Sequence, residues 1–361
     1  MRTVGVEEEL LLVSPDTGEP QAVAGAVLAA QDADDDGARL APELQREQLE
    51  TTTRPKLQMS DLALELRRWR NVASERAREA GADVVALATS PLPVAPSVSA
   101  GRRYHRLVEE FGLTAQEQLT CGCHVHVQVA SDEEGVAVLD RIRPWLPVLL
   151  ALSANSPFWQ GRDSEHSSYR NRVWGRWPSA GPVQTFGSAE RYHAEVRALL
   201  ETGTLLDEGM IYFDARLSRN YPTVEVRVAD VCVAVDDTVL LAAMIRGLVE
   251  TAVRSWQAGE PPTPVTVGLL RLATWRAARS GVSDRLVHPV TWQPAPAEAV
   301  GEAFVDHIAD ALTDADDLLL VKDNLRRLMN RGGGAGVQRA TFASTGDLRA
   351  VVRDAMVRTL A

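Results

Sequence analysis

Several short segments of this chain alternate valine with charged side chains, and this pattern restricts the fold more than any other feature. The clearest example is residues 223–230, in which Glu225 and Arg227 alternate with three valines. Side chains of a β-strand point to its two faces in turn, so this strand would have one apolar and one charged face. Keeping charged side chains next to a hydrophobic core costs free energy, so we interpret the charged face of this strand as part of a functional site.

The same alternation occurs in two other segments and, more weakly, in a third. Near the N-terminus it puts Glu7 and Glu9 on one face of a short strand. Farther along it puts His124 and His126 opposite three valines, and Arg216 follows an aspartate by two residues. Strands of this kind side by side predict a sheet with one apolar face and one face lined by carboxylates, imidazoles and guanidinium groups.

Composition excludes several classes of protein. The chain has 361 residues, of which 45% are hydrophobic and 24% charged, as in ordinary soluble proteins. The net charge of -11 argues against a general nucleic-acid binder. We find neither a signal-peptide pattern nor an apolar run long enough to cross a bilayer, and we therefore expect a cytoplasmic protein that does not bind membranes.

The order of the predicted elements favours one domain. Helices are predicted to begin near Ser60, Ser131 and Asp236, the second of them opened by a capping box. From about residue 268 onward the pattern is helical. The proline-rich stretches are too short to be domain linkers, so we predict a single catalytic domain over residues 1–361 with a mainly helical C-terminal third.

Five carboxylates and one imidazole form a candidate metal site, with two of the acids coming from a segment outside the three strands. These residues are Glu7, Glu9, Glu43, Glu50, His124 and Glu225. Carboxylate oxygens suit Mg²⁺, and an imidazole among them suits Mn²⁺ better than Ca²⁺. Crowded acids repel one another, and bound cations would relieve that repulsion. Taken alone, the first strand could be a solvated edge and Glu225 with Arg227 a simple ion pair.

The cysteines beside the histidines invite a zinc interpretation, which the strand pattern disfavours. Cys121 and Cys123 would share the valine face, opposite His124 and His126. One tetrahedral site cannot draw ligands from both faces of a strand, so we interpret the thiols as small buried hydrophobic groups.

Nine segments in combination match a known family. They are residues 5–10, 43–53, 122–127, 152–157, 161, 169–170, 181–182, 214–216 and 223–230. In these segments the chain resembles the carboxylate-amine ligases of the type 2 glutamate–cysteine ligase family, which are similar in fold to glutamine synthetase and the guanidino kinases. The resemblance spans residue 1 to about residue 280. It implies an α+β fold with a curved, mostly antiparallel sheet, helices on one face and an open active-site cleft on the other.

The resemblance also implies a reaction and roles for residues. ATP would phosphorylate the γ-carboxylate of glutamate, and an amine, such as cysteine, would attack the acyl phosphate. One metal ion, Mg²⁺ or Mn²⁺, would be held by Glu7, Glu43 and Glu50, and another by Glu9, His124 and Glu225. The groups that would contact the phosphoryl group or the carboxylate substrate are His126, Arg227, Arg170 and Arg216.

Two segments of the sequence depart from what these expectations would suggest. Residues 331–336 are glycine-rich but lack the Lys-Ser/Thr ending of a Walker A motif, and we interpret them as a flexible loop. Arg46 and Glu47 form an unusual pair beside Glu50, which leaves the acceptor amine open, and Gln45 or Arg46 could serve its pocket.

Two other functions are weighed against the ligase. A metal-dependent hydrolase would use the same histidines and acids around an activated water and would not need ATP. A catalytically inactive relative would only bind metabolites, but the presence of all six metal-site residues argues against it. The sequence leaves a homodimer open.

Overall fold

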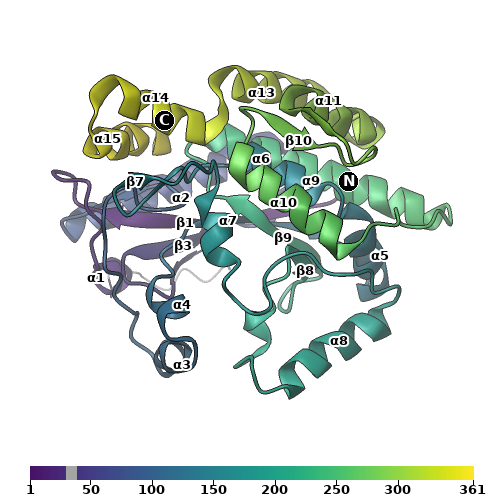
Figure 1. Ribbon diagram of the computed structural model, residues 1–361, viewed down its shortest axis with the longest axis horizontal. Helices are drawn as coiled ribbons and strands as arrows, with labels where there is room; N and C mark the ends of the chain where they lie inside the picture. Colours follow the sequence, from purple (N-terminus) through teal and green to yellow (C-terminus); the bar gives the residue numbers. More distant parts are fainter. Residues whose placement is uncertain (30–38) are drawn as a thin grey trace.

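A seven-stranded sheet lies at the centre of the computed structural model, which describes residues 1–29 and 39–361 (Figure 1). The strand order is β2-β3-β1-β5-β9-β8, with β4 also paired to β1, and these pairs are antiparallel. The strands are β1 (Val4–Val13), β2 (Arg39–Pro42), β3 (Gln48–Thr52), β4 (Asp83–Val85), β5 (Gly122–Gln128), β8 (Ala215–Leu217) and β9 (Thr223–Asp230). The expectation of a mostly antiparallel α+β sheet is confirmed.

The three alternating segments are the three central strands. On β5 and β9, Val125 and Val226 are opposite one another in the register, and both side chains are fully buried. Beside this pair, Glu7 of β1 is the register partner of His124, and Glu225 is the register partner of His126. The period-2 pattern therefore has the predicted result: one face of the sheet is core and the other carries charge.

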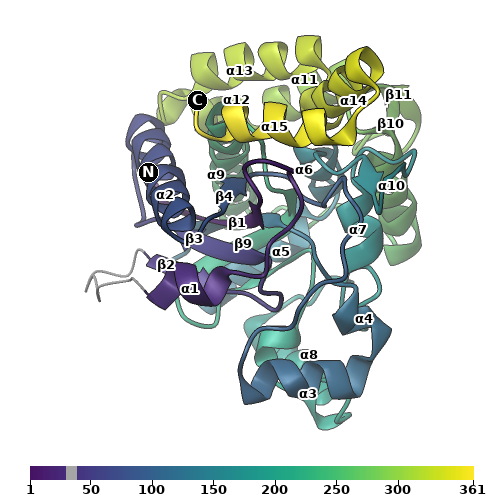
Figure 2. The ribbon, with the colours of Figure 1, turned by 90° about the vertical axis from the view of Figure 1, so that its left-hand side faces the viewer.

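Four helices cover the apolar face. They are α2 (Met59–Glu79), α5 (Asp132–Ile142), α6 (Leu146–Ser153) and α9 (Val235–Gln257), and α9 is buried over most of its length. A further layer lies beyond them, formed by helices of the C-terminal part of the chain (Figures 1 and 2). The elements of this part of the chain are α10 (Val267–Ser280), β10 (Arg285–Val287), β11 (Pro294–Pro296), α11 (Ala297–His307), α12 (Ala309–Asp314), α13 (Leu318–Arg331), α14 (Gly333–Thr345) and α15 (Leu348–Thr359). Of these, α15 also packs directly against β4.

The charged face is bordered by short elements instead of a helical layer. Figure 1 shows α3, α4 and α8 on the side of the sheet opposite the C-terminal helices. The remaining elements are α1 (Ala24–Ala29), α3 (Arg102–Phe111), α4 (Leu113–Gln116), β6 (Phe158–Trp159), β7 (Arg162–Asp163), α7 (Tyr169–Trp174), α8 (Ala189–Glu201) and a 3₁₀ turn, η1 (Glu208–Met210). Within the described residues, no helix combines the length and apolar character needed to span a bilayer.

Most helix starts agree with the sequence pattern. The Ser131 side chain accepts a hydrogen bond from the Glu134 backbone N–H, which confirms the predicted cap of α5. Helix α9 begins one residue before Asp236. The predicted cap of α2 at Ser60 is wrong, because the helix begins at Met59 and Gln58 occupies the cap position without a side-chain hydrogen bond.

The glycine-rich segment is not the predicted flexible loop. Only Gly332, with φ of 79°, joins two helices, and α14 begins at the next residue. Gly334 packs against Asn155 so closely that a Cβ atom there would lie 2.4 Å from the Asn155 side-chain oxygen. Glycine is therefore required here by packing, a reason that composition does not show.

The three cysteines, Cys121, Cys123 and Cys232, are free and buried, which confirms the prediction made for the first two. Cys121 and Cys123 belong to the hydrophobic core, and burial raises the pKa of both thiols. Uncharged thiols in an apolar environment are inert and are poor metal ligands.

One charged pair lies inside the helix-covered side of the sheet. Glu8, between the two site acids of β1, points away from the charged face and is fully buried. Both of its carboxylate oxygens accept hydrogen bonds from Arg70 of α2, at 2.6 and 2.9 Å. The same guanidinium group donates to the carbonyl oxygens of Cys232, Val233 and Thr359. Arg70 therefore connects the first strand, α2, the start of α9 and the end of α15.

Replacing Arg70 with methionine should destabilise the protein strongly. The change leaves the Glu8 carboxylate buried without its partner, which typically costs about 3–5 kcal/mol. Urea unfolding followed by circular dichroism measures the loss. Changing Glu8 to methionine in the same protein should recover part of the lost stability. As a control, Arg326→Met breaks an exposed ion pair with Asp323 and should change stability by about 1 kcal/mol or less. A stable Arg70→Met protein would mean that this pair is unimportant for folding.

Candidate active site

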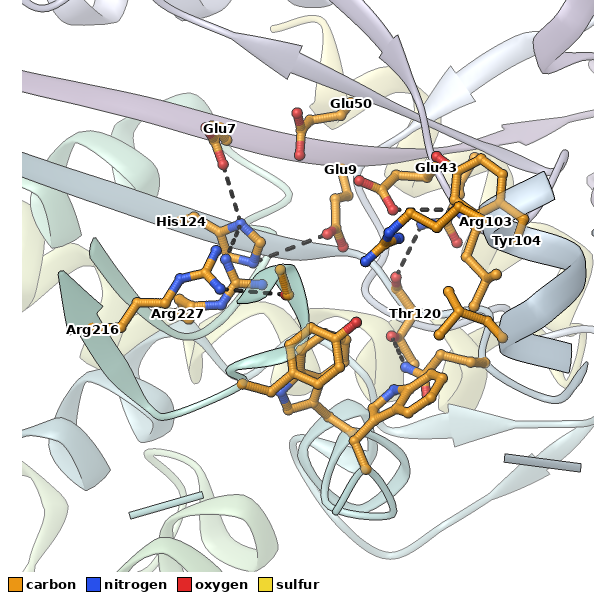
Figure 3. A pocket seen from close by; sticks show the side chains of 18 residues that line it. Glu7, Glu9, Glu43, Glu50, Arg103, Tyr104, Thr120, His124, Arg216 and Arg227 are labelled. Carbon is orange, nitrogen blue, oxygen red and sulfur yellow. Dashed lines mark hydrogen bonds and ion pairs between the residues drawn. The ribbon is translucent and has the colours of Figure 1, made fainter. Parts of the chain in front are cut away.

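The charged face of the sheet forms one wall of a cavity of about 240 Å³ (Figure 3). Four acids line it: Glu7, Glu9, Glu43 and Glu50. Arg216 and Arg227 line it as well, and Figure 3 shows them on the far side of His124 from Glu9 and Glu50. The cavity is therefore the open cleft that was expected on this face.

His124 of β5 lies beside two acids of the neighbouring strand, β1. Its Nδ1 atom is 3.4 Å from the Glu7 Oε2 atom, and its Nε2 atom is 4.0 Å from the Glu9 Oε1 atom. Glu50 is the register partner of Glu9 in the β1–β3 pair, so it approaches the same place from the next strand. Antiparallel pairing thus brings together residues from three distant parts of the sequence.

Two groups of side chains have the chemistry and spacing of cation sites. Glu7, His124 and Glu225 form one, and Glu9, Glu50 and His124 form the other, with the ligand atoms of each group within 4.8 Å of one another. His124 Nε2 is buried and has no hydrogen-bond partner among the described residues, as expected of an atom kept for a ligand. The acids and this nitrogen fit Mg²⁺ or Mn²⁺.

The grouping differs from the one that the resemblance implied. Glu50 is grouped with Glu9 instead of Glu7, and Glu225 is grouped with Glu7 instead of Glu9. Glu43 lines the cavity but belongs to neither three-residue group.

The pKa values of the acids are shifted because these side chains are buried close to one another. Burial, with the charge of Glu9 adding to it, raises the pKa of Glu43 to about 8. Burial and the charges of neighbouring acids, Glu7 first among them, raise the pKa of Glu50 well above its usual range. Burial would also raise the pKa of Glu7, but hydrogen bonds and charge from the two β5 histidines outweigh it and lower that pKa. A bound cation would lower the cost of keeping these acids ionised together.

Glu225 lies deeper than the other acids and contacts two arginines. Arg216 donates to its two oxygens at 2.8 and 3.3 Å, and Arg227 forms an ion pair with it. Burial alone would raise the pKa of Glu225, but the charges of these arginines outweigh it and the pKa is lowered. The pair of guanidinium groups makes this end of the cavity suited to a phosphate or a carboxylate.

Arg170 lies behind the cavity wall and does not line it. Its side chain is 2% exposed, 3.9 Å from Asp230, and packs so closely on Gly122 that a Cβ atom there would lie 2.2 Å from its Nη2 atom. The Gly122 backbone N–H donates to Glu9. The structure thus gives Arg170 a place supporting Glu9, not the ligand-facing place that the resemblance implied.

His126 borders a second cavity, of about 290 Å³, whose lining is mainly apolar. Its Nε2 atom is 3.4 Å from Glu7, and its ring contacts Tyr221 edge to face. Pro55 and Pro222 also line this second cavity. Glu7 lines both cavities, so the acid cluster lies where they meet.

Sequence reasoning missed the aromatic wall and the polar floor of the first cavity. The wall is formed by Tyr104, Trp174, Trp177 and Tyr212, and the floor by Gln48, Gln118 and Thr120. The aromatic residues come from short helices and loops, which have no strand periodicity. Gln48 could have been found, because it lies two residues before Glu50 and so shares its strand face.

The expectation that Gln45 or Arg46 serves an acceptor pocket is wrong. Gln45 is fully buried, and its side-chain N–H donates to the Ala115 carbonyl oxygen at 2.8 Å. Arg46 is exposed, and neither residue lines the cavity.

Comparison with known proteins gives consistent matches. The family model described as glutamate-cysteine ligase family 2 matches residues 3–354. A Streptomyces avermitilis protein named "Putative glutamate--cysteine ligase 2-1" is 58% identical over 360 residues, covering 99% of each chain. A Streptomyces coelicolor protein named "Putative glutamate--cysteine ligase 2" is 56% identical over 362 residues, covering 100% of each chain.

Solved structures share the fold at low sequence identity. The glutamate–cysteine ligase of Francisella tularensis, solved in complex with AMP, has a TM-score of 0.72 and 14% identity, covering 99% of this chain and 88% of that one. The ligase PafA, solved in complex with the prokaryotic ubiquitin-like protein Pup, has a TM-score of 0.57 and 12% identity, covering 98% of this chain and 72% of that one.

Proposed function

The chain belongs to glutamate-cysteine ligase family 2, and from that membership we propose that it joins the γ-carboxylate of glutamate to an amine with consumption of ATP. The observation that carries the proposal is the cluster of Glu7, Glu9, Glu50 and Glu225 around His124, with Arg227 beside it. Acids alone would repel a triphosphate, whereas cations held by these acids, together with arginines, would attract it.

The proposed reaction has two steps. A γ-carboxylate oxygen of glutamate attacks the γ-phosphorus of ATP, and ADP leaves. The amine nitrogen then attacks the acyl carbon, phosphate leaves and the nitrogen loses a proton. Mg²⁺ or Mn²⁺ held by the two groups would neutralise charge on the phosphate oxygens.

The protein's own contribution to these steps is mainly electrostatic. Arg227, in the cavity wall beside the acids, would stabilise the charge on the transferring phosphoryl oxygens, and Arg216 would assist from the next strand. Arg170 would act indirectly, by holding the Gly122 backbone against Glu9.

The second cavity is the candidate site for the nucleotide base. Its lining is mainly apolar, it contains the Tyr221 ring, and it meets the acid cluster at Glu7. A base in this cavity would direct its phosphates toward the cations and Arg227. The AMP found in the Francisella tularensis neighbour supports nucleotide use in this fold.

The proposal includes a cytoplasmic location and a small-molecule amine. Three free cysteines among the described residues suit a reducing compartment. The relatives' names point to cysteine as the amine, and the cavity lining does not by itself select it.

An assay of the purified protein with ATP, Mg²⁺, glutamate and a panel of amines tests the proposal. We expect ADP release that requires both glutamate and an amine, with one amide product formed per ADP. Omitting each component in turn is the control. Product formed without ATP would instead identify the metal-dependent hydrolase, and binding without any turnover would identify the inactive relative.

A further inference from the structure

Five buried polar atoms of residues that line the first cavity have no hydrogen-bond partner in the described part of the chain. Two of them, His124 Nε2 and Arg227 Nε, lie at the acid cluster. The other three are the side-chain oxygens of Gln48 and Gln118 and the indole nitrogen of Trp177. These side chains are 3–4% exposed, and all three residues line the cavity. A buried polar atom left without a partner typically costs about 1–3 kcal/mol, so these three atoms, two in the floor and one in the aromatic wall, point to a ligand that satisfies them.

Thr120 determines which atom each amide group presents. The Gln48 side-chain N–H donates to the Thr120 carbonyl oxygen at 3.5 Å, and the Gln118 side-chain N–H donates to the Thr120 hydroxyl at 2.6 Å. Both amides therefore keep their oxygens free to accept hydrogen bonds. The Trp177 indole can only donate. A fitting ligand has a group that donates and a group that accepts.

The position of Gln48 gives the length of that ligand. Gln48 lies two residues before Glu50 on β3, which is about 7 Å along the strand. In glutamate the γ-carboxyl carbon and the α-carbon are three bonds apart, about 4 Å. A hydrogen bond from the head group adds about 3 Å. Glutamate with its γ-carboxylate at the acid cluster therefore reaches Gln48 with its α-amino group.

We propose that Gln48, Gln118 and Trp177 form the subsite for the free α-amino and α-carboxylate groups of the carboxylate donor. The two amide oxygens accept from the ammonium group. The Trp177 N–H donates to the carboxylate, and the Arg103 guanidinium group, which lines the same cavity and pairs with Asp207, adds positive charge there. The inference rests on the proposed function. It restricts the donor to a free amino acid and excludes a glutamyl side chain within a protein.

Two analogues of glutamate separate these contacts. Glutarate lacks the amino group, and 4-aminobutyrate lacks the α-carboxylate, while each keeps a carboxylate that can be phosphorylated. Hydroxylamine serves as the common acceptor, so that acceptor recognition does not enter. In the wild-type protein, kcat/KM for ADP release should be higher for glutamate than for either analogue.

Isosteric variants should then remove one preference at a time. Gln48→Met and Gln118→Met should each reduce the preference for glutamate over glutarate by about 10- to 100-fold, the usual effect of one hydrogen bond to a charged group. Trp177→Phe should reduce the preference for glutamate over 4-aminobutyrate by a similar factor. Each variant should leave the other preference nearly unchanged. If one of the three variants fails to fold, the other two still test the inference.

Matched controls are available elsewhere in the chain. Gln45→Met and Trp145→Phe change buried residues of the same types that do not line the cavity, and both should keep the wild-type preferences. If the three cavity variants lose glutamate and analogue turnover in parallel, the residues are structural and the inference is wrong.

A binding measurement separates this inference from the proposed function. Calorimetry with a non-hydrolysable ATP analogue and Mg²⁺ gives affinities for glutamate and glutarate without turnover. If glutamate binds more tightly than glutarate and Gln48→Met removes that difference in affinity, the inferred subsite is confirmed even when no ADP is released. Equal affinities for the two acids in the wild-type protein would overturn it.

Discussion

Glu225→Gln is expected to lower turnover by about 10³-fold or more, with nucleotide binding weakened only when a divalent cation is present. Glu225 supplies one of the three ligand atoms in its group and is the ion-pair partner of both Arg216 and Arg227. Glutamine has nearly the same shape but no charge. It therefore removes the strongest attraction for a cation at this point and leaves two guanidinium groups without their anion.

Steady-state ADP release over a Mg²⁺ titration, with calorimetry of nucleotide binding with and without Mg²⁺, measures both effects. Glu134→Gln is the matched control, because Glu134 is also a buried acid paired with an arginine, Arg2, and lies outside the cavity. That variant should keep its activity. Wild-type turnover in Glu225→Gln would remove Glu225 from the metal site and reduce it to a structural ion-pair partner.

Arg227→Lys should lower turnover by about 10²-fold while the protein stays folded. The Arg227 side chain lies in the wall of the cavity, and its Nε atom has no hydrogen-bond partner among the described residues. A planar guanidinium group can contact two phosphate oxygens at once, whereas an ammonium group cannot reproduce this geometry. Lysine would still neutralise Glu225, so the ion pair and the fold should persist.

Turnover with saturating ATP and glutamate, with circular dichroism melting as the stability measurement, separates the two possible roles. Arg246→Lys is a useful contrast, because Arg246 is a buried arginine paired with Asp317 away from the cavity, and its replacement should affect melting more than turnover. If Arg227→Lys keeps nearly normal turnover, or unfolds the protein, then Arg227 serves the fold and the proposed stabilisation of the phosphoryl group needs another cation.

The faces of the sheet could be predicted from sequence because they depend on a local rule. Alternation along a strand assigns side chains to faces without knowledge of any other strand. This is why Glu7, Glu9, His124, Glu225 and Arg227 were chosen from the sequence and lie together in the structure.

The pairing of acids within the cluster could not be predicted in the same way. Glu50 approaches Glu9 because these two residues are register partners, and register depends on contacts between distant segments. The resemblance implied a different pairing. Likewise, nothing in the sequence around Arg170 shows that its helix, α7, presents it to the back of Gly122. The aromatic wall was missed because its residues come from segments without periodicity.

The position of His124 between two acid groups restricts how they can share it. A neutral imidazole carries one proton and one lone pair, so it can be a ligand through only one nitrogen. Two contacts compete at Nδ1: Glu7 Oε2, an acceptor, lies 3.4 Å away, and Arg227 Nη1, a donor, lies 3.5 Å away. A proton on Nδ1 leaves the lone pair on Nε2, the atom that faces Glu9, whereas a proton on Nε2 leaves it on Nδ1, the atom that faces Glu7. In either tautomer one of the two groups is left with oxygen donors alone, which makes the two positions chemically unequal.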